Sequence, residues 1–477
     1  MSTVEEKAKG YLRGQGITLM GIAGPERWKD GPPSIDPTYM LPGAKSIIAW
    51  AWPFNVPAIY DFLSKKSIGP HNLDQLKQAQ RMNRIAKELA ELLKGMGYKA
   101  TQVMTNNTYR RSPDIFANRP SLSHRFAGAI TGLGTFGLSG NLVTKEYGAA
   151  ILLDTVVTDA VLKSDPVLPA RYTFDNRCRT CKLCEKSCTL GMFQDNEEEY
   201  MLLNKELHPR GKRNNIDFCA LPCFGLHGIS RDRKWSTWGR HWATKWLETL
   251  PDPQDRTGVR AMQTRMGAKA GDSTPRYEAI RRSSAILWPK EKFEDLIPDY
   301  EKLPQSEEEL YKLAVQVQEN MGVHGLKDPW AQTCGNCAIV CGPDFEETKK
   351  RFDVLTQSGI VVPGEGGKLV HTNSFEEAMG IKKKYPHRIE ASLIARDAAN
   401  SGGLWVRYYF GFEPKSELQN LLYQQKAKRA AARAGLAGKQ AKDPAIYDLK
   451  WALAALFDQE KKKKRLDASK DTTEYNA

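Results

Sequence analysis

The stretch CRTCKLCEKSC, residues 178–188, places four cysteines in the spacing C-x2-C-x2-C-x3-C. A second stretch, TCGNCAIVC at residues 333–341, carries three more in the spacing C-x2-C-x3-C. The last two of the nine cysteines are Cys219 and Cys223, in DFCALPCFG. In a chain of 477 residues without a visible secretory signal, such clusters indicate metal binding rather than a disulfide framework.

The spacing of the first run distinguishes a structural zinc site from an iron–sulfur cluster. A structural zinc site needs four ligands, usually two C-x2-C pairs. The first run instead has the bacterial-ferredoxin spacing, in which a short loop holds three corners of one [4Fe–4S] cluster and the fourth cysteine ligates the other cluster. Two clusters need eight thiolates, and nine cysteines are present. We therefore predict two [4Fe–4S] clusters, with structural zinc as the alternative.

The crossover pattern assigns four cysteine ligands to each of the two clusters. For the second cluster the pattern gives three ligands, and the fourth is either Cys219 or Cys223. A departure from the ferredoxin run is Thr189, which stands where proline usually follows the fourth cysteine. The first predicted set is Cys178, Cys181, Cys184 and Cys341, and the second is Cys188, Cys334, Cys337 and one of the two open candidates.

Composition is that of a globular protein, with 41% hydrophobic and 26% charged residues. The polar first residues and the lack of a run of about 18 apolar residues predict a cytoplasmic protein without a transmembrane segment. The net charge is +14, and part of it lies in the basic stretches at 426–442 and 461–465. We expect a solubilising, partly disordered end there, and the alternative is a surface for an acidic partner such as RNA or a membrane.

About 170 residues precede the first cysteine run, enough for a domain. Apolar periodicity predicts a long helix from Leu73 that stops at Gly95–Gly97, and buried strands over 45–52 and 149–162. The glycine-rich stretch 130–148 permits tight turns and close backbone approach to a flat ligand. It contains a formal G-x-G-x-x-G, but a strand follows rather than a long helix, so we do not predict a dinucleotide site.

The order of short motifs in this chain resembles that of the corrinoid-dependent iron–sulfur reductases. A GY near a helix end is followed by GLG, EYG and VVTD, and then by the cysteine run. This family includes reductive dehalogenases and epoxyqueuosine reductases. The resemblance implies an α+β protein with a nitroreductase-like corrinoid-binding domain at 1–168. A bacterial-ferredoxin-like two-[4Fe–4S] domain would follow at 169–345, with a large insertion at about 224–333. The segment 346–477 would be helical with a basic tail.

The resemblance also implies site residues. NNIDFC resembles the family segment that ends in a cluster ligand, which favours Cys219 over Cys223. Tyr98 is the expected proton donor, supported by the amide of Asn118, and Tyr109 is the rival acid. The expected corrinoid (cobalamin) contacts are Gly132, Gly134, Gly137, Tyr147 and Gly148.

The implied activity is that of a reductive dehalogenase, which removes halide from an organohalide with a Co(I) corrinoid reduced through the two clusters. An external low-potential donor such as a ferredoxin or flavodoxin would supply the electrons. One alternative is an epoxyqueuosine-type reductase acting on tRNA. Asn118 argues against it, because those enzymes carry an acidic Asp there and an amide has no proton to give. The other alternative is a non-catalytic two-cluster electron-transfer protein.

Two departures concern the substrate region. The Arg that often follows the EYG turn in dehalogenases is replaced by Ala149, and Arg125 or Arg111 would have to substitute for it. The insertion carries Trp235, Trp238, Trp242 and Trp246, whose spacing predicts one face of a helix. That face would be either a packing stripe or an apolar lid over the substrate.

Overall fold

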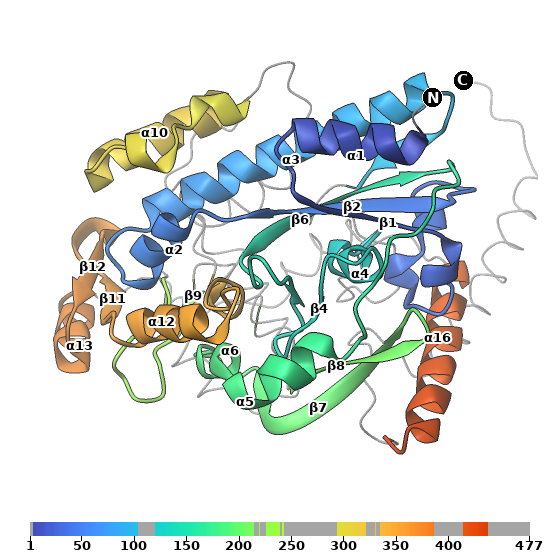
Figure 1. Ribbon diagram of the computed structural model, residues 1–477. Coiled ribbons are helices and arrows are strands. Elements are labelled where there is room, and N and C mark those ends of the chain that lie inside the picture. Colours follow the sequence, from blue (N-terminus) through green and yellow to red (C-terminus); the bar gives the residue numbers. More distant parts are fainter. Residues whose placement is uncertain are drawn as a thin grey trace, which may run out of the picture.

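The computed structural model describes residues 3–103, 120–213, 219, 226–238, 241–242, 293–320, 330, 334–385 and 414–436. It is a mixed helix and strand structure (Figure 1). Its central antiparallel sheet has the order β1-β2-β6-β3. The bounds of these strands are Leu19–Ala23, Ser46–Pro53, Ile151–Thr158 and Ala100–Gln102. The strands predicted over 45–52 and 149–162 are therefore confirmed as β2 and β6.

The outer face of the sheet is covered by α1 (Val4–Gly14) and α3 (Gly69–Gly95), as Figure 1 shows. The predicted long helix is confirmed, and it starts four residues earlier because Pro70 is tolerated in the first turn. Beyond its end, Gly97 has a φ of +91°, which reverses the chain. Ile48 and Trp50 of β2 point to these helices and are fully buried.

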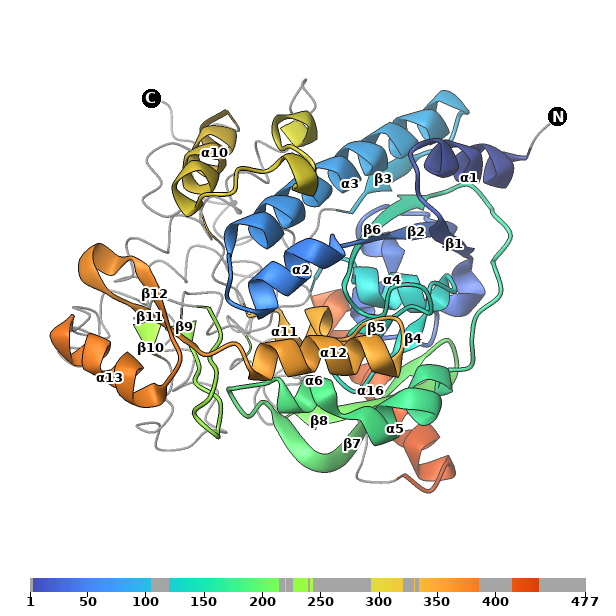
Figure 2. The ribbon, with the colours of Figure 1, turned by 60° about the vertical axis from the view of Figure 1, so that its left-hand side comes forward.

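The inner face receives the alternate residues of β2, Ile47 and Ala49. They pack with α4 (His124–Ile130) and with the short strands β4 (Thr135–Phe136) and β5 (Leu142–Val143). On this side lie the elements that carry the cysteines (Figure 2). These are the π-helical turn η4 (Phe174–Cys178), α5 (Arg179–Cys181), α6 (Leu183–Lys186) and α11 (Asn336–Ile339).

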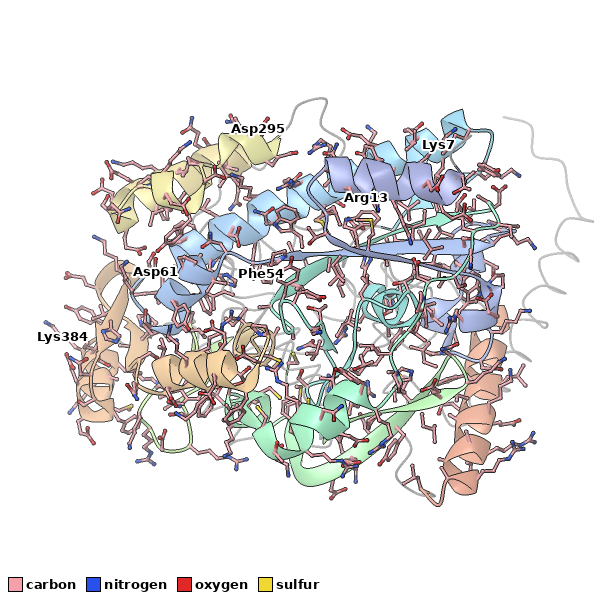
Figure 3. The ribbon with its side chains drawn as sticks, in the orientation of Figure 1. Lys7, Arg13, Phe54, Asp61, Asp295 and Lys384 are labelled. Atoms are coloured by element: carbon pink, nitrogen blue, oxygen red, sulfur yellow. The ribbon has the colours of Figure 1, made fainter. Side chains whose placement is uncertain are left out.

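The remaining elements surround this core. A second apolar cluster joins Phe54, labelled in Figure 3, to Trp235 and Trp238. The bounds of the other elements are α2 Val56–Leu63, β7 Phe193–Leu203, β8 Glu206–Arg213, β9 Leu226–His227, β10 His241–Trp242, η6 Phe293–Leu296, η7 Tyr300–Lys302, α10 Glu307–Asn320, α12 Phe345–Thr356, β11 Ile360–Pro363, β12 Leu369–Thr372, α13 Phe375–Lys384 and α16 Pro414–Arg433.

The structure differs from two predictions of local structure. Where the structure describes the Trp-rich stretch, Ser236 pairs with Ile229 in an isolated bridge and His241–Trp242 is a strand; Trp246 lies outside the described residues. The C-terminal segment is not all helical, since β11 and β12 form a hairpin at 360–372. In the basic stretch 426–442, α16 extends to Arg433 and buries Ala427 and Ala431, while 437–442 and 461–465 lie outside the described residues. Among the described residues, no helix has the length and apolar character needed to cross a bilayer.

Candidate metal centre

The first group of thiols comes from one compact turn and one distant residue. Lys182, with a φ of +51°, lies between α5 and α6 and bends the chain so that successive cysteines face one region. Burial, followed by the charges of Cys341 and Cys181, raises the pKa of the Cys178 thiol to about 12. Burial and the charges of Cys341 and Cys178 also raise the pKa of Cys184. The first quartet, as we call it, is Cys178, Cys181, Cys184 and Cys341.

The second group is assembled from three separate segments. Burial, then the charges of Cys188 and Cys337, raises the pKa of Cys334. Burial, then Cys219 and Cys188, raises the pKa of Cys337 to about 12. These mutual influences define the second quartet as Cys188, Cys219, Cys334 and Cys337. Cys223, the other candidate for the last ligand, lies outside the described residues.

The thiols of each quartet influence one another. Within the described part of the chain, no three His, Cys, Asp or Glu side chains form a ready-made site for one metal ion. The thiols are nevertheless near enough to alter each other's pKa. Four cysteine thiolates are the ligands that a [4Fe–4S] cluster takes, so each quartet has the donors for one cluster.

The chemistry of the donors fits iron–sulfur clusters as well. All eight described cysteines are free thiols, and no disulfide removes any of them. Burial raises the pKa values of six of them, so these thiols hold protons when no metal is bound; they are Cys178, Cys184, Cys188, Cys334, Cys337 and Cys341. Metal binding replaces these protons and supplies the positive charge that stabilises buried thiolates.

Arg177 ties the two cysteine motifs together. Its guanidinium donates to the Gly342 carbonyl at 2.7 Å and to the Pro343 carbonyl at 3.0 Å. The same group lies 3.8 Å from Cys341 Sγ. It therefore holds the residues after the second motif against the start of the first. In the sequence, only its position directly before Cys178 points to a role of Arg177 near the thiols.

Lys65 is a buried cation beside the second quartet. It is 4% exposed, has a φ of +63°, and lies over the rings of Phe62 and Trp238 at 5.9 and 5.8 Å. Burial lowers its pKa to about 7, and the charge of Cys334 opposes this shift. Among the described residues, no carboxylate pairs with it. No sequence signal marked this lysine, because Trp238 and Cys334 are distant from it in the chain.

The glycines expected to contact a corrinoid are packed closely on other parts of the chain. A Cβ added at Gly132 would lie 2.2 Å from the Pro166 carbonyl oxygen, and one at Gly134 would lie 2.2 Å from that of Val143. At Gly148 it would lie 2.1 Å from the Gly342 carbonyl oxygen and at Gly137 3.4 Å from Cys178 Sγ. Close packing is thus one reason for glycine at these positions, and their contact with a corrinoid stays a prediction.

Of the other predicted site residues, Tyr98 and Tyr147 contact parts of the chain away from the cysteine motifs. Tyr98 packs against the apolar cluster of α1, α3 and the outer face of the sheet. Tyr147 reaches Thr18, with 3.0 Å between the hydroxyl oxygens. Asn118, Tyr109 and Arg111 lie outside the described residues. Arg125 does lie on the inner face, near the second quartet, where it forms hydrogen bonds with the turn 137–141.

No family model matches the chain. It is 25% identical over 180 residues to an epoxyqueuosine reductase of Atelocyanobacterium thalassa (isolate ALOHA), a match that covers 36% of this chain. The match covers 51% of the relative, so the chain spans about half the length of the curated relative it matches.

Solved structures similar to the chain include reductive dehalogenases and epoxyqueuosine reductases. A reductive dehalogenase aligns with a TM-score of 0.34 and 14% identity, over 62% of this chain and 38% of the other. An epoxyqueuosine reductase with a tRNA stem loop aligns with a TM-score of 0.32 and 14% identity, over 74% of this chain and 98% of the other. Likeness at this level does not decide between the two activities.

Proposed function

We propose that this chain is an oxidoreductase that passes single electrons through two [4Fe–4S] clusters to a reductive reaction. The observation that carries the proposal is the grouping of eight free thiols into two quartets, each of which combines residues of both cysteine motifs. The quartets are adjacent, because the Cys184 thiol is affected by Cys341 of its own quartet and by Cys337 of the other. Adjacent clusters permit electron transfer from one to the other.

The reaction we propose is removal of halide from an organohalide, as the resemblance to reductive dehalogenases implies. A corrinoid would supply the cobalt chemistry at the carbon–halogen bond. Of the glycines expected to contact it, Gly132, Gly134 and Gly148 also pack closely on backbone carbonyl oxygens of the chain. The role of this chain's described residues is to hold the clusters, shield them and set their potentials.

A second candidate is reduction of epoxyqueuosine in tRNA. The 180-residue match to an epoxyqueuosine reductase favours it, and so does the net charge of +14, which suits a polyanionic partner. Asn118 disfavours it, because an amide cannot supply the proton.

The experiment compares the two activities in one preparation. Protein purified and reconstituted without oxygen, with iron, sulfide and a corrinoid, is supplied with a low-potential reductant. Halide release is scored against several organohalides, and queuosine formation is scored on epoxyqueuosine-containing tRNA. Halide release supports the dehalogenase proposal, and queuosine formation without halide release replaces it by the second candidate.

Metal analysis of the same preparation tests the cluster proposal separately. We expect about eight irons and eight acid-labile sulfides per chain, as two [4Fe–4S] clusters require. Zinc without labile sulfide would contradict the clusters. Cys219→Ser is expected to alter one cluster, while Cys223→Ser leaves both intact; the reverse result would assign the last ligand to Cys223.

A further inference from the structure

The turn 137–141, with the sequence GLSGN, joins β4 to β5 and is tightly held. Gly137 N donates to the Asn141 carbonyl at 3.0 Å, and Gly140 N donates to the Gly137 carbonyl at 2.8 Å. Gly140 has a φ of +70°, a conformation that glycine adopts without strain. Two arginines fix the turn from outside: Arg125 donates to the Gly140 carbonyl at 3.1 Å, and Arg213 donates to the Ser139 carbonyl.

One end of this turn touches the first quartet. The Cα of Gly137 is so close to Cys178 that an added Cβ would lie 3.4 Å from its Sγ. Leu138, the next residue, forms a small buried cluster with Phe174 and Cys178. The start of the turn is thus in contact with a predicted ligand of the first cluster.

The other end touches the second quartet. Asn141 Nδ2 lies 3.6 Å from Cys337 Sγ, within hydrogen-bonding distance for sulfur. Arg125 Nη1 lies 3.4 Å from Asn141 Oδ1. A guanidinium can only donate, so the amide oxygen must face Arg125 and the NH2 group must face the sulfur. Arg125 therefore fixes the orientation in which Asn141 is a donor to Cys337.

We propose that Asn141, oriented by Arg125, is a positioning residue that raises the reduction potential of the second cluster selectively. The inference rests on the proposed clusters. Reduction adds negative charge to a cluster and its thiolates. A fixed N–H donor at one of these sulfurs stabilises the reduced form more than the oxidised form. Among the described residues, Asn141 is the one side-chain amide with a hydrogen bond to a cysteine sulfur.

The test is a redox titration followed by electron paramagnetic resonance on anaerobically reconstituted protein. Asn141→Leu keeps a similar volume and removes the donor. We expect one of the two midpoint potentials to become more negative while the other stays unchanged. Arg125→Lys keeps a positive charge near Cys219 and Cys337 but removes the guanidinium that fixes the amide, so it should shift the same potential in the same direction by a smaller amount. The cluster that shifts is identified by comparison with Cys337→Ser, which changes one ligand of the second cluster.

Asn176→Leu is the matched control. Asn176 is an exposed asparagine close to the first quartet, and its amide donates to the Tyr172 carbonyl at 2.8 Å rather than to a sulfur. Both potentials should equal those of the wild type. If Asn141→Leu loses iron, Asn141→Asp provides the second measurement, since it keeps the shape, places an acceptor at the sulfur and should lower the same potential further.

The outcomes separate the inference from the proposed function. Unchanged potentials in Asn141→Leu at wild-type iron content overturn the inference and leave the clusters in place. A shift of both potentials, or of the first cluster alone, also overturns it. Wild-type protein that binds neither iron nor sulfide contradicts the proposed function before any potential is measured.

Discussion

The two faces of the central sheet differ in the kind of side chain that they bury. At the outer face, Leu12 of α1 and Leu89 of α3 are buried together with Trp50 of β2. These side chains stabilise one another by apolar packing. On the side of the inner face lie the cysteine thiols and the buried Lys65. Arg125 and Arg177 also lie there and donate hydrogen bonds to backbone carbonyls. Figure 2 shows the two sets of elements on opposite sides of β2 and β6.

Under the proposed function, the outer face is complete in the polypeptide alone, whereas the inner face binds iron–sulfur clusters. Burying apolar surface is favourable without any further group. Burying thiols and cations is costly unless opposite charges compensate them. Eight thiolates bound to iron would supply such compensation on the inner face. The outer face also holds a buried ionisable residue, Asp154, which alternation along β6 places on the same side as Val156.

The largest effect is expected for Gly148→Ala, on the inner side. Gly148 has a φ of +67°, and the new Cβ would meet the carbonyl oxygens of Gly342 and Cys341 at 2.1 and 2.2 Å. The segment that carries Cys341 must move, so the first cluster should be lost together with about half of the iron. Gly10→Ala in α1, where nothing lies within 4 Å of the added Cβ, should keep full iron. Full iron in both variants would break the distinction between the faces.

Leu89→Ala tests the outer face alone. Leu89 is fully buried in the apolar cluster of α1, α3 and the sheet. The variant should lower the free energy of unfolding by about 2–5 kcal/mol, the usual cost of a buried Leu→Ala change. Denaturant titration measures this loss, and iron analysis of the folded variant should give the wild-type value. Loss of one cluster in the folded variant would show that the faces are coupled.

His124 gives the inner face a pH dependence. Its Nδ1 lies 2.8 Å from Thr155 Oγ1, and burial lowers its pKa to about 4. The unfolded chain binds a proton below about pH 6.5 while the folded chain does not, so stability is lost as pH falls from about 6.5 to 4. The full contribution is at most about 3 kcal/mol. Unfolding of His124→Gln, followed over this range, should be less dependent on pH than that of the wild type.

Asp154 should show the opposite trend from the outer face. Its carboxyl is buried, one of its oxygens has no partner among the described residues, and burial raises its pKa well above the usual range. The unfolded chain releases this proton above about pH 4 while the folded chain keeps it, so the contribution of Asp154 to stability decreases as pH rises. Asp154→Asn should therefore be more stable than the wild type at pH 7, by about 1–3 kcal/mol. Equal unfolding curves at pH 7 would contradict a neutral, buried acid.

The smallest effect is expected for Tyr98→Phe. The ring of Tyr98 packs on the outer apolar cluster, and phenylalanine keeps that contact. Stability should change by less than about 0.5 kcal/mol, and turnover should stay within about twofold of the wild type. A fall of about 10²–10⁴ in turnover with full iron would instead restore Tyr98 as the proton donor.

Sequence patterns determined the elements whose cause is local. Periodic apolar residues defined α3, and the glycines after it marked its end. A continuous apolar run defined β2, since a strand buried on both faces needs no alternation. In the described part of the Trp-rich stretch, helical spacing did not predict the structure: Trp238 donates to the Phe62 carbonyl at 2.9 Å, a contact between residues distant in the chain. Helical spacing is therefore reliable only where the partner surface is a helix-packing face.

The candidate site divides in the same way. The order and spacing of the cysteines by themselves indicated two metal-binding groups, because a short loop can present only thiols that are close in sequence. Tertiary structure alone decided that Asn141 reaches Cys337, that Lys65 is buried over Trp238, and that Gly148 is packed on the carbonyls beside Cys341. These contacts join residues that are 173 to 196 positions apart in the chain. The physical reason is that hydrogen bonds, burial and close backbone approach depend on which segments meet in space, and local spacing carries no record of that.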